Sequence, residues 1–168
     1  MGAQKGGAMN RRVRTVAVFL LMTSLACKGS GSGPTPIDPA ASATLIVDGQ
    51  SFTPAKKGMS ALDRTGGVTD IGLNNCAGTS VVLSVSAPLA VGVHPISRLN
   101  QAAFFNSVGQ WDYVKGQGRG TLTFTSTSPR LVGSFEFDMA ASAGPGATGT
   151  KFVQGTFDVT YGNGTVCK

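Results

Sequence analysis

The stretch LVGSFEFDM at residues 131–139 decides the fold, because every second residue in it is apolar or glycine. The positions between these are mostly polar, Glu136 and Asp138 among them. The same alternation recurs at residues 120–126 and 153–161. A period of two places alternate side chains on one face of a β-strand. Three consecutive strands of this kind predict an antiparallel meander with one buried face.

Weaker strand signals fill the rest of the chain. A hairpin turn is expected at Asp48-Gly49, and a second at the glycine-rich residues 116–120, joining 111–114 to 121–124. The chain has 24 glycines and a single glutamate, which argues against helices. Further strands are expected at residues 43–47, 51–54, 68–73, 80–85, 92–96, 102–105 and 111–114. About eight to ten short strands predict an all-β domain at residues 43–168, either an antiparallel sandwich or an up-and-down barrel.

Residues 1–26 have the three parts of an export signal: a basic segment, a short apolar segment and small residues at the end. The apolar segment is well short of the ~20 residues that span a bilayer. Residues 27–42 are rich in Gly, Ser, Pro and Ala, a composition typical of a flexible tether. Either Met1 or Met9 fits as the start of this signal.

A cysteine directly after such a signal resembles the lipobox of bacterial lipoproteins, in which this residue becomes the acylated N-terminus. Ala26 and Cys27 match that pattern, and Ser24 and Leu25 match its looser form. The resemblance implies lipid attachment at Cys27 and, because Lys28 rather than Asp follows, sorting to the outer membrane. The alternative is an ordinary signal peptide cut near Ala26, with Cys27 incidental.

Two further cysteines, Cys76 and Cys167, form an even pair once Cys27 carries lipid. Disulfides form and persist in the oxidising compartments that exported proteins enter. Each cysteine follows a predicted strand, so both should lie at strand ends where chain segments meet. A disulfide between Cys76 and Cys167 is therefore expected, with 90 residues between them.

The formal charge of +6 overstates how basic the exported protein is. Four of the 14 basic residues precede Cys27, which leaves ten against eight acidic residues. A near-neutral domain offers no electrostatic basis for binding nucleic acid. The expected partners are the membrane, through the N-terminal lipid, and an envelope protein or glycan.

Few residues suit catalysis or metal binding. His94 is the single histidine, and no acid that could orient it is evident. Glu136 and Asp138 share a strand face and are expected to be solvated rather than a catalytic carboxylate pair. Zinc sites need clustered Cys and His. We therefore expect no catalytic residues, no metal and no cofactor, and hence a protein that is not an enzyme.

Trp111 and Tyr113 lie two residues apart, on one face of a predicted strand. Exposed, they would form a stacking surface for a sugar ring or an apolar ligand. The sequence favours a place in the core, and ligand binding by Trp111 and Tyr113 is the alternative.

Short motifs at residues 47–52, 92–96, 133–137 and 155–160 resemble those of a group of small secreted bacterial lipoproteins of unknown function. That group shares an N/D-G-x-x-F/W start, a G-x-y-x-I/L strand and two G-x-F strands near the end. The resemblance implies a glycine-rich all-β domain over most of residues 43–161. It brings no catalytic residues with it.

Three hypotheses about function remain open. The first is a membrane-anchored, non-catalytic module that binds a component of the cell envelope. The second is a barrel that holds a small apolar ligand against Phe124, Phe135, Phe137 and Phe157. The third, a remote alternative, is a hydrolase that uses His94.

Overall fold

The computed structural model describes residues 37–64, 66–94, 99–114, 116–162 and 167. The predicted signal peptide, Cys27 and most of the predicted tether lie outside these residues. In the described residues, no helix has the length and hydrophobicity needed to cross a membrane. Besides a short 3-10 helix at Lys56–Gly58, the elements are β1 (Ser42–Val47), β2 (Gln50–Phe52), β3 (Met59–Arg64), β4 (Val68–Asn74), β5 (Ser80–Ser86), β6 (Gly92–Val93), β7 (Leu99–Asn106), β8 (Gly109–Asp112), β9 (Gly120–Ser126), β10 (Arg130–Ala143) and β11 (Thr150–Thr160).

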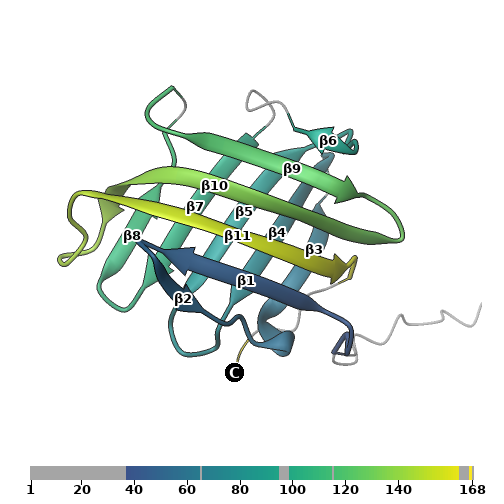
Figure 1. Ribbon diagram of the computed structural model, residues 1–168, viewed down its shortest axis with the longest axis horizontal. Coiled ribbons are helices and arrows are strands. Elements are labelled where there is room, and N and C mark those ends of the chain that lie inside the picture. Colours follow the sequence, from purple (N-terminus) through teal and green to yellow (C-terminus); the bar gives the residue numbers. More distant parts are fainter. Residues whose placement is uncertain (1–36, 65, 95–98, 115, 163–166, 168) are drawn as a thin grey trace, which may run out of the picture. The chain divides into compact units, whose positions relative to one another are not determined.

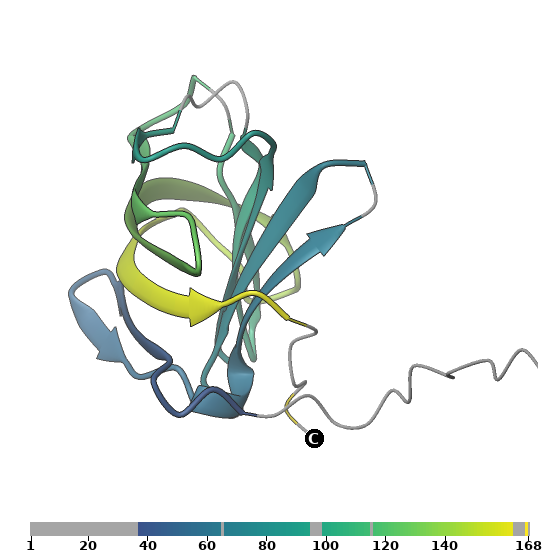
Figure 2. The same cartoon turned by 90° about the vertical axis from the view of Figure 1, so that its right-hand side faces the viewer.

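The strands form two layers that face each other (Figure 1). Strands β9, β10, β11 and β1 make the front layer, and β7, β5, β4 and β3 lie behind them at a steep crossing angle. Figure 2 shows the two layers from the side. The pairing runs β2-β1-β11-β10-β8-β7-β5-β4-β3, with β9 and β6 on a branch from β10. The all-β fold predicted from the sequence is confirmed, and its two antiparallel layers fit a sandwich.

Strand β10 belongs to both layers. Its first half, Val132 to Phe137, pairs with β9, and its end, Ala140 to Ala143, pairs with β8. Both neighbours lie on one side of β10, while β11 pairs along its other side. In crossed sandwiches the corners are made by strands that pass from one sheet to the other. The 14-residue β10 has this role.

One predicted hairpin is wrong. The sequence led us to expect residues 111–114 and 121–124 to pair around the turn at 116–120. The structure pairs both segments with β10 instead, at different points along it. The predicted meander of β9, β10 and β11 is confirmed, as is the tight turn at Asp48-Gly49, where both residues have positive φ.

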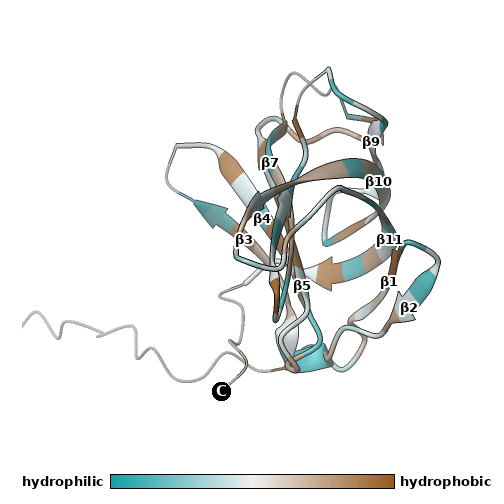
Figure 3. Ribbon diagram, turned by 90° about the vertical axis from the view of Figure 1, so that its left-hand side faces the viewer, coloured by the Kyte–Doolittle hydropathy of each residue, from teal (hydrophilic) through white to brown (hydrophobic). Residues whose placement is uncertain are grey.

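Apolar and polar residues alternate along the strands, and the apolar side chains form the core. On β10 the odd-numbered residues from Leu131 to Met139 are buried, and on β11 Val153, Phe157 and Val159 are buried. Figure 3 shows hydrophobic and hydrophilic positions interleaved along these strands. The back layer contributes aliphatic side chains of β4 and β5 together with Phe104 and Trp111. Burying one face of each sheet against the other provides the main stabilising free energy.

The eleven-stranded sheet does not close into a barrel. Its ends are β2 and β3, and one isolated parallel bridge, Ala61 to Tyr161, connects the chain after β11 to β3 in the described part of the molecule. The backbone N–H of Gly162 donates to the carbonyl of Ala61 at 2.9 Å. The structure therefore favours the sandwich over the up-and-down barrel. The strand β3 was not predicted from the sequence.

The folded domain begins earlier than residue 43. Asp38 accepts a hydrogen bond from Arg130 at 2.8 Å and another from Thr160 at 3.1 Å, and Ala41 is buried. The last five residues of the predicted tether, 38–42, therefore belong to the folded domain. Arg130 and Thr160 lie more than 90 positions from Asp38 in the sequence, so local composition could not indicate these two contacts.

Candidate functional site

A groove of about 420 Å³ crosses the outer face of the front layer, the face toward the viewer in Figure 1. Four adjacent strands supply its lining: β9, β10, β11 and β1. The lining residues are Thr44, Ile46, Thr121, Ser134, Phe135, Glu136, Gln154, Gly155 and Thr156. They lie on the outward-facing positions of the alternating strands, except Phe135 and Gly155.

Strand register arranges the groove in two rows of side chains. Thr121, Glu136, Gln154 and Ile46 are successive cross-strand partners and form one row. Ser134, Thr156 and Thr44 form the second row in the same way. Phe135 and Gly155, which are partners of each other, lie between the rows and supply the floor. The groove therefore runs across the strands rather than along them.

The two rows differ in whether their polar side chains are hydrogen-bonded to other groups of the protein. In the second row the hydroxyls of Thr44 and Thr156 are hydrogen-bonded to each other at 2.9 Å. In the first row Glu136 and Gln154 face each other across β10 and β11. Neither side chain has a hydrogen-bond or ion-pair partner within the described residues. A carboxylate and a carboxamide are thus free to bind a ligand, supplying acceptors and two donors.

Ion pairs flank the groove without entering it. The guanidinium of Arg119 binds the carboxylate of Asp138 through two hydrogen bonds, at 3.1 and 3.0 Å, and lies 4.0 Å from the ring centre of Phe152. Hydrogen bonds from the Arg119 side chain and backbone hold the pKa of Asp138 below its usual value. On the far side Arg130 pairs with Asp38 and Asp158. The Arg119–Asp138 pair is neutral, whereas Arg130 with its two carboxylates is net negative. Glu136 is the one charged side chain among the lining residues that the structure describes.

Glu136 and Asp138 therefore share a face, as predicted, but not a function. Asp138 is fixed by Arg119, whereas Glu136 faces the groove. The two carboxylates do not form an acid–base pair. The described part of the chain also contains no cluster of His, Cys, Asp and Glu that could hold a metal ion.

The aromatic pair lies mainly inside the molecule. The side chain of Trp111 is 2 % exposed, its indole N–H donates to the carbonyl of Thr148 at 3.2 Å, and its ring centre lies 5.6 Å from that of Phe104. Tyr113 is partly buried against Phe137, with ring centres 4.9 Å apart. Trp111 is thus a core residue, which the sequence favoured, and it offers no exposed ring face for stacking. The ligand-binding alternative for Trp111 is wrong.

The four phenylalanines of the apolar-ligand hypothesis are all buried and pack on one another. Ring centres lie 6.0 Å apart for Phe124 and Phe157, 6.3 Å for Phe135 and Phe137, and 6.5 Å for Phe135 and Phe157. The groove of the front layer is lined by one of these rings, Phe135. This arrangement favours a packed core over a ligand cavity.

His94 also lies in the core, 4 % exposed, with its ring edge-on to Phe124 at 5.5 Å between centres. Its backbone N–H donates to the carbonyl of Leu122 at 2.8 Å, which extends the β6–β9 pairing. His94 is not among the residues that line the groove of the front layer. The hydrolase hypothesis gains no support from this placement.

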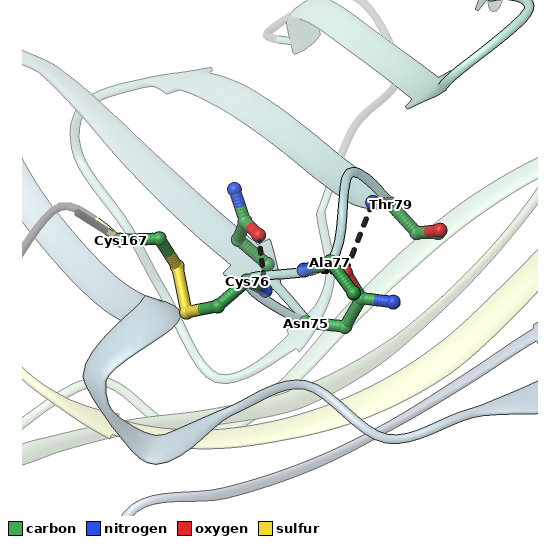
Figure 4. The surroundings of a disulfide bond; sticks show 6 residues. Asn75, Cys76, Ala77, Thr79 and Cys167 are labelled. Carbon is green, nitrogen blue, oxygen red and sulfur yellow. Dashed lines mark hydrogen bonds between the residues drawn. A yellow bond between two sulfur atoms is a disulfide. The ribbon is translucent and has the colours of Figure 1, made fainter.

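The structure contains the expected disulfide between Cys76 and Cys167, with their Cα atoms 5.2 Å apart (Figure 4). Cys76 lies in the loop between β4 and β5 and has a positive φ of 59°. Its neighbour Asn75 holds the loop, because the side-chain oxygen accepts hydrogen bonds from the backbone N–H groups of Ala77 and Thr79 at 2.8 and 2.9 Å. The bridge attaches the C-terminal end of the chain to this loop.

Comparisons of the chain with protein-family models, with curated proteins and with solved structures found no match. The choice of the groove as the candidate functional site therefore rests on its geometry alone. The sequence pointed to Glu136 but not to its neighbours Gln154 and Thr121, nor to Thr44 in the second row. The available signal was the run of Thr, Ser and Gln at outward positions of β1, β9, β10 and β11, but strand order was needed to bring these positions together.

Proposed function

We propose that this chain is an exported lipoprotein, anchored to the outer membrane through Cys27, whose β domain binds an uncharged glycan of the cell envelope without chemically changing it. The observation that carries the proposal is the outer-face groove, with the unoccupied Glu136 and Gln154 side chains on one side and threonine and serine hydroxyls on the other.

The groove suits a hydroxyl-rich, uncharged chain. Sugar hydroxyls both donate and accept hydrogen bonds, and the carboxylate of Glu136, the carboxamide of Gln154 and the hydroxyl of Thr121 complement them. Ile46 and the threonine methyl groups offer small apolar contacts for sugar C–H groups. A polyanion is disfavoured because the one charged group in the lining is negative.

The carboxylate count supports binding rather than hydrolysis. Glycoside hydrolases in general use two carboxyl groups on opposite sides of the scissile bond. The described lining of the groove has one, Glu136, and the nearest candidate for a second, Asp138, is held by Arg119. This arrangement supports a module that retains a glycan.

Two observations support export and anchoring. The chain has a lipobox-like Cys27 after an apolar segment, and a disulfide joins Cys76 to Cys167, a bond typical of oxidising compartments. Because the folded domain begins by Asp38, the chain from Cys27 to Asp38 can extend at most about 40 Å, at roughly 3.5 Å per residue. A groove on such a tether samples glycans close to the membrane surface.

Binding to immobilised polysaccharides tests the proposal. The full chain carrying Cys27→Ala, which removes the proposed acyl anchor, is applied to a panel of neutral and acidic envelope polysaccharides. We expect retention on a neutral polysaccharide, with binding about tenfold weaker for Glu136→Ala and for Gln154→Ala because each removes a ligand hydrogen bond. Asp112→Asn, a carboxylate on β8 outside the groove, is the matched control and should bind like the parent. Equal binding by all four proteins would rule out the groove.

A further inference from the structure

A second cleft, of about 350 Å³, lies at the end of the sandwich where β11 finishes and the β9–β10 turn is found, on the right in Figure 1. Four segments that are distant in sequence converge there: the β3–β4 hairpin, the segment after β5, the β9–β10 turn and the residue after β11. Its polar lining is supplied by Asp63, Thr69, Thr127 and Tyr161. It shares no residue with the glycan groove, and the proposal below is independent of the proposed function.

Tyr161 forms a fixed aromatic wall of this cleft. Its hydroxyl donates to the carbonyl of Thr127 at 3.1 Å, across to the β9–β10 turn. Its backbone bridges to Ala61 of β3, and the next residue, Gly162, donates to the Ala61 carbonyl at 2.9 Å. Tyr161 as a whole is 36 % exposed, so part of its surface remains available for contact.

Asp63 is the one charged side chain in the described lining. One of its carboxylate oxygens accepts a hydrogen bond from the hydroxyl of Thr69 at 2.6 Å. The adjacent cation, Arg64, does not neutralise it, because the Arg64 guanidinium pairs with Asp70 instead. Partial burial, followed by the negative charge of Asp63, raises the pKa of Tyr161, which is consistent with the carboxylate and the phenol lying within electrostatic reach of each other.

The remaining surface is apolar, formed by Val68, Ala87 and Leu89. The phenol hydrogen of Tyr161 is already committed to Thr127, so the strongest polar group left is an acceptor, the second oxygen of Asp63. A carboxylate beside an aromatic ring attracts a cation through both an ion pair and a cation–π contact. The apolar wall suits a hydrocarbon body attached to that cation.

We propose that this cleft binds a small organic ammonium ion, with the ammonium group at the Asp63 carboxylate and the apolar body against Tyr161, Leu89 and Val68. The volume is at the lower end of the range for small-molecule sites, about 300–1,000 Å³. Anions are repelled by Asp63, and neutral analogues lose both electrostatic contacts.

Isothermal titration of the full chain carrying Cys27→Ala tests this with three probes of nearly the same shape: phenethylammonium, 2-phenylethanol and phenylacetate. We expect phenethylammonium to bind at least about tenfold more tightly than the alcohol, and the acetate not to bind. Adding salt should weaken the ammonium complex more than the alcohol complex. Equal affinities for the ammonium and the alcohol, or no saturable binding of the ammonium, would overturn the proposal.

Variants then locate the site. Asp63→Asn should remove the preference for the ammonium, and Tyr161→Leu should weaken ammonium binding while leaving the preference for positive charge. Asp112→Asn, on β8 and in the lining of neither cleft, is the matched control and should leave ammonium binding unchanged. The comparison of the three probes on the Cys27→Ala parent keeps the test valid if a further variant fails to fold. Tighter binding of Nα-acetyl-lysine amide than of phenethylammonium would overturn the assignment to a free small molecule, in favour of a lysine side chain from a protein.

Discussion

The ring of Phe135 lies over Gly155, its direct partner on the neighbouring strand β11. A Cβ atom placed on Gly155 would lie 2.8 Å from Cζ of Phe135 and would also collide with the backbone carbonyl of Thr44 on β1. The same arrangement occurs in reverse two pairs away, where Phe157 lies over Gly133. On the buried face of the sheet, each ring occupies the space above its partner glycine, which has no side chain. The outer side of the Phe135–Gly155 pair is the floor of the groove.

Gly155→Ala should therefore destabilise the domain by roughly 1–3 kcal/mol, the usual cost of overpacking a filled core. The Thr44 carbonyl belongs to the sheet backbone, so β1 must move to make room. Chemical denaturation measures the change. Gln154→Ala, the next residue but facing outward, should stay within about 0.5 kcal/mol of the parent. A stability of Gly155→Ala equal to that of the parent would contradict the close packing.

Replacing both Cys76 and Cys167 by serine should lower the free energy of unfolding by about 2–4 kcal/mol. The bridge closes a long loop, with the two cysteines 91 positions apart, and so restricts the unfolded chain. Urea unfolding with and without reductant provides the measurement. Reductant should shift the midpoint of the parent toward that of the double variant and leave the double variant unchanged. A midpoint in the double variant that equals that of the oxidised parent would refute a stabilising bridge.

The Arg119–Asp138 pair should make stability depend on pH in the acid range. The pKa of Asp138 is lowered in the folded protein by the Arg119 side chain first and then by its backbone N–H. A lowered carboxyl pKa contributes stability that is complete above the unfolded value, about 3.9, and is lost as the pH falls through the folded value. The difference in melting temperature between parent and Asp138→Asn should be small, positive at pH 7 and reduced at pH 2. A difference of the same size at both pH values would contradict this role.

Cys27 is expected to carry lipid. Cells fed a fatty-acid analogue should label the parent protein and not Cys27→Ala, because the lipobox resemblance assigns acylation to this residue. Cys76→Ser is the matched control, a cysteine that should leave labelling intact. Equal labelling of the parent and Cys27→Ala would exclude the lipid anchor.

The period-two pattern was sufficient to predict β9, β10 and β11, because each has one buried and one exposed face. It missed β3, where Met59, Ala61 and Leu62 are residues common in helices and the burial alternates over only half the strand. The predicted hairpin between residues 111–114 and 121–124 is wrong because both segments pair with β10 instead. Local turn signals do not indicate such a pairing.

The disulfide could be predicted from compartment and cysteine number. The groove could not, because it needs the order of β9, β10, β11 and β1, and β1 comes from the opposite end of the domain. The cleft at Tyr161 likewise depends on a contact between residues 100 positions apart, Ala61 and Tyr161.

The most direct test of the central claim is an NMR titration of the isotopically labelled full chain carrying Cys27→Ala with oligosaccharides cut from a neutral envelope polysaccharide. We predict saturable chemical-shift changes that concentrate on Thr121, Glu136, Gln154 and Thr156, with residues of the back layer unchanged. Shift changes that fall elsewhere on the domain, or none at saturating oligosaccharide, would contradict the assignment of the groove as a glycan-binding site.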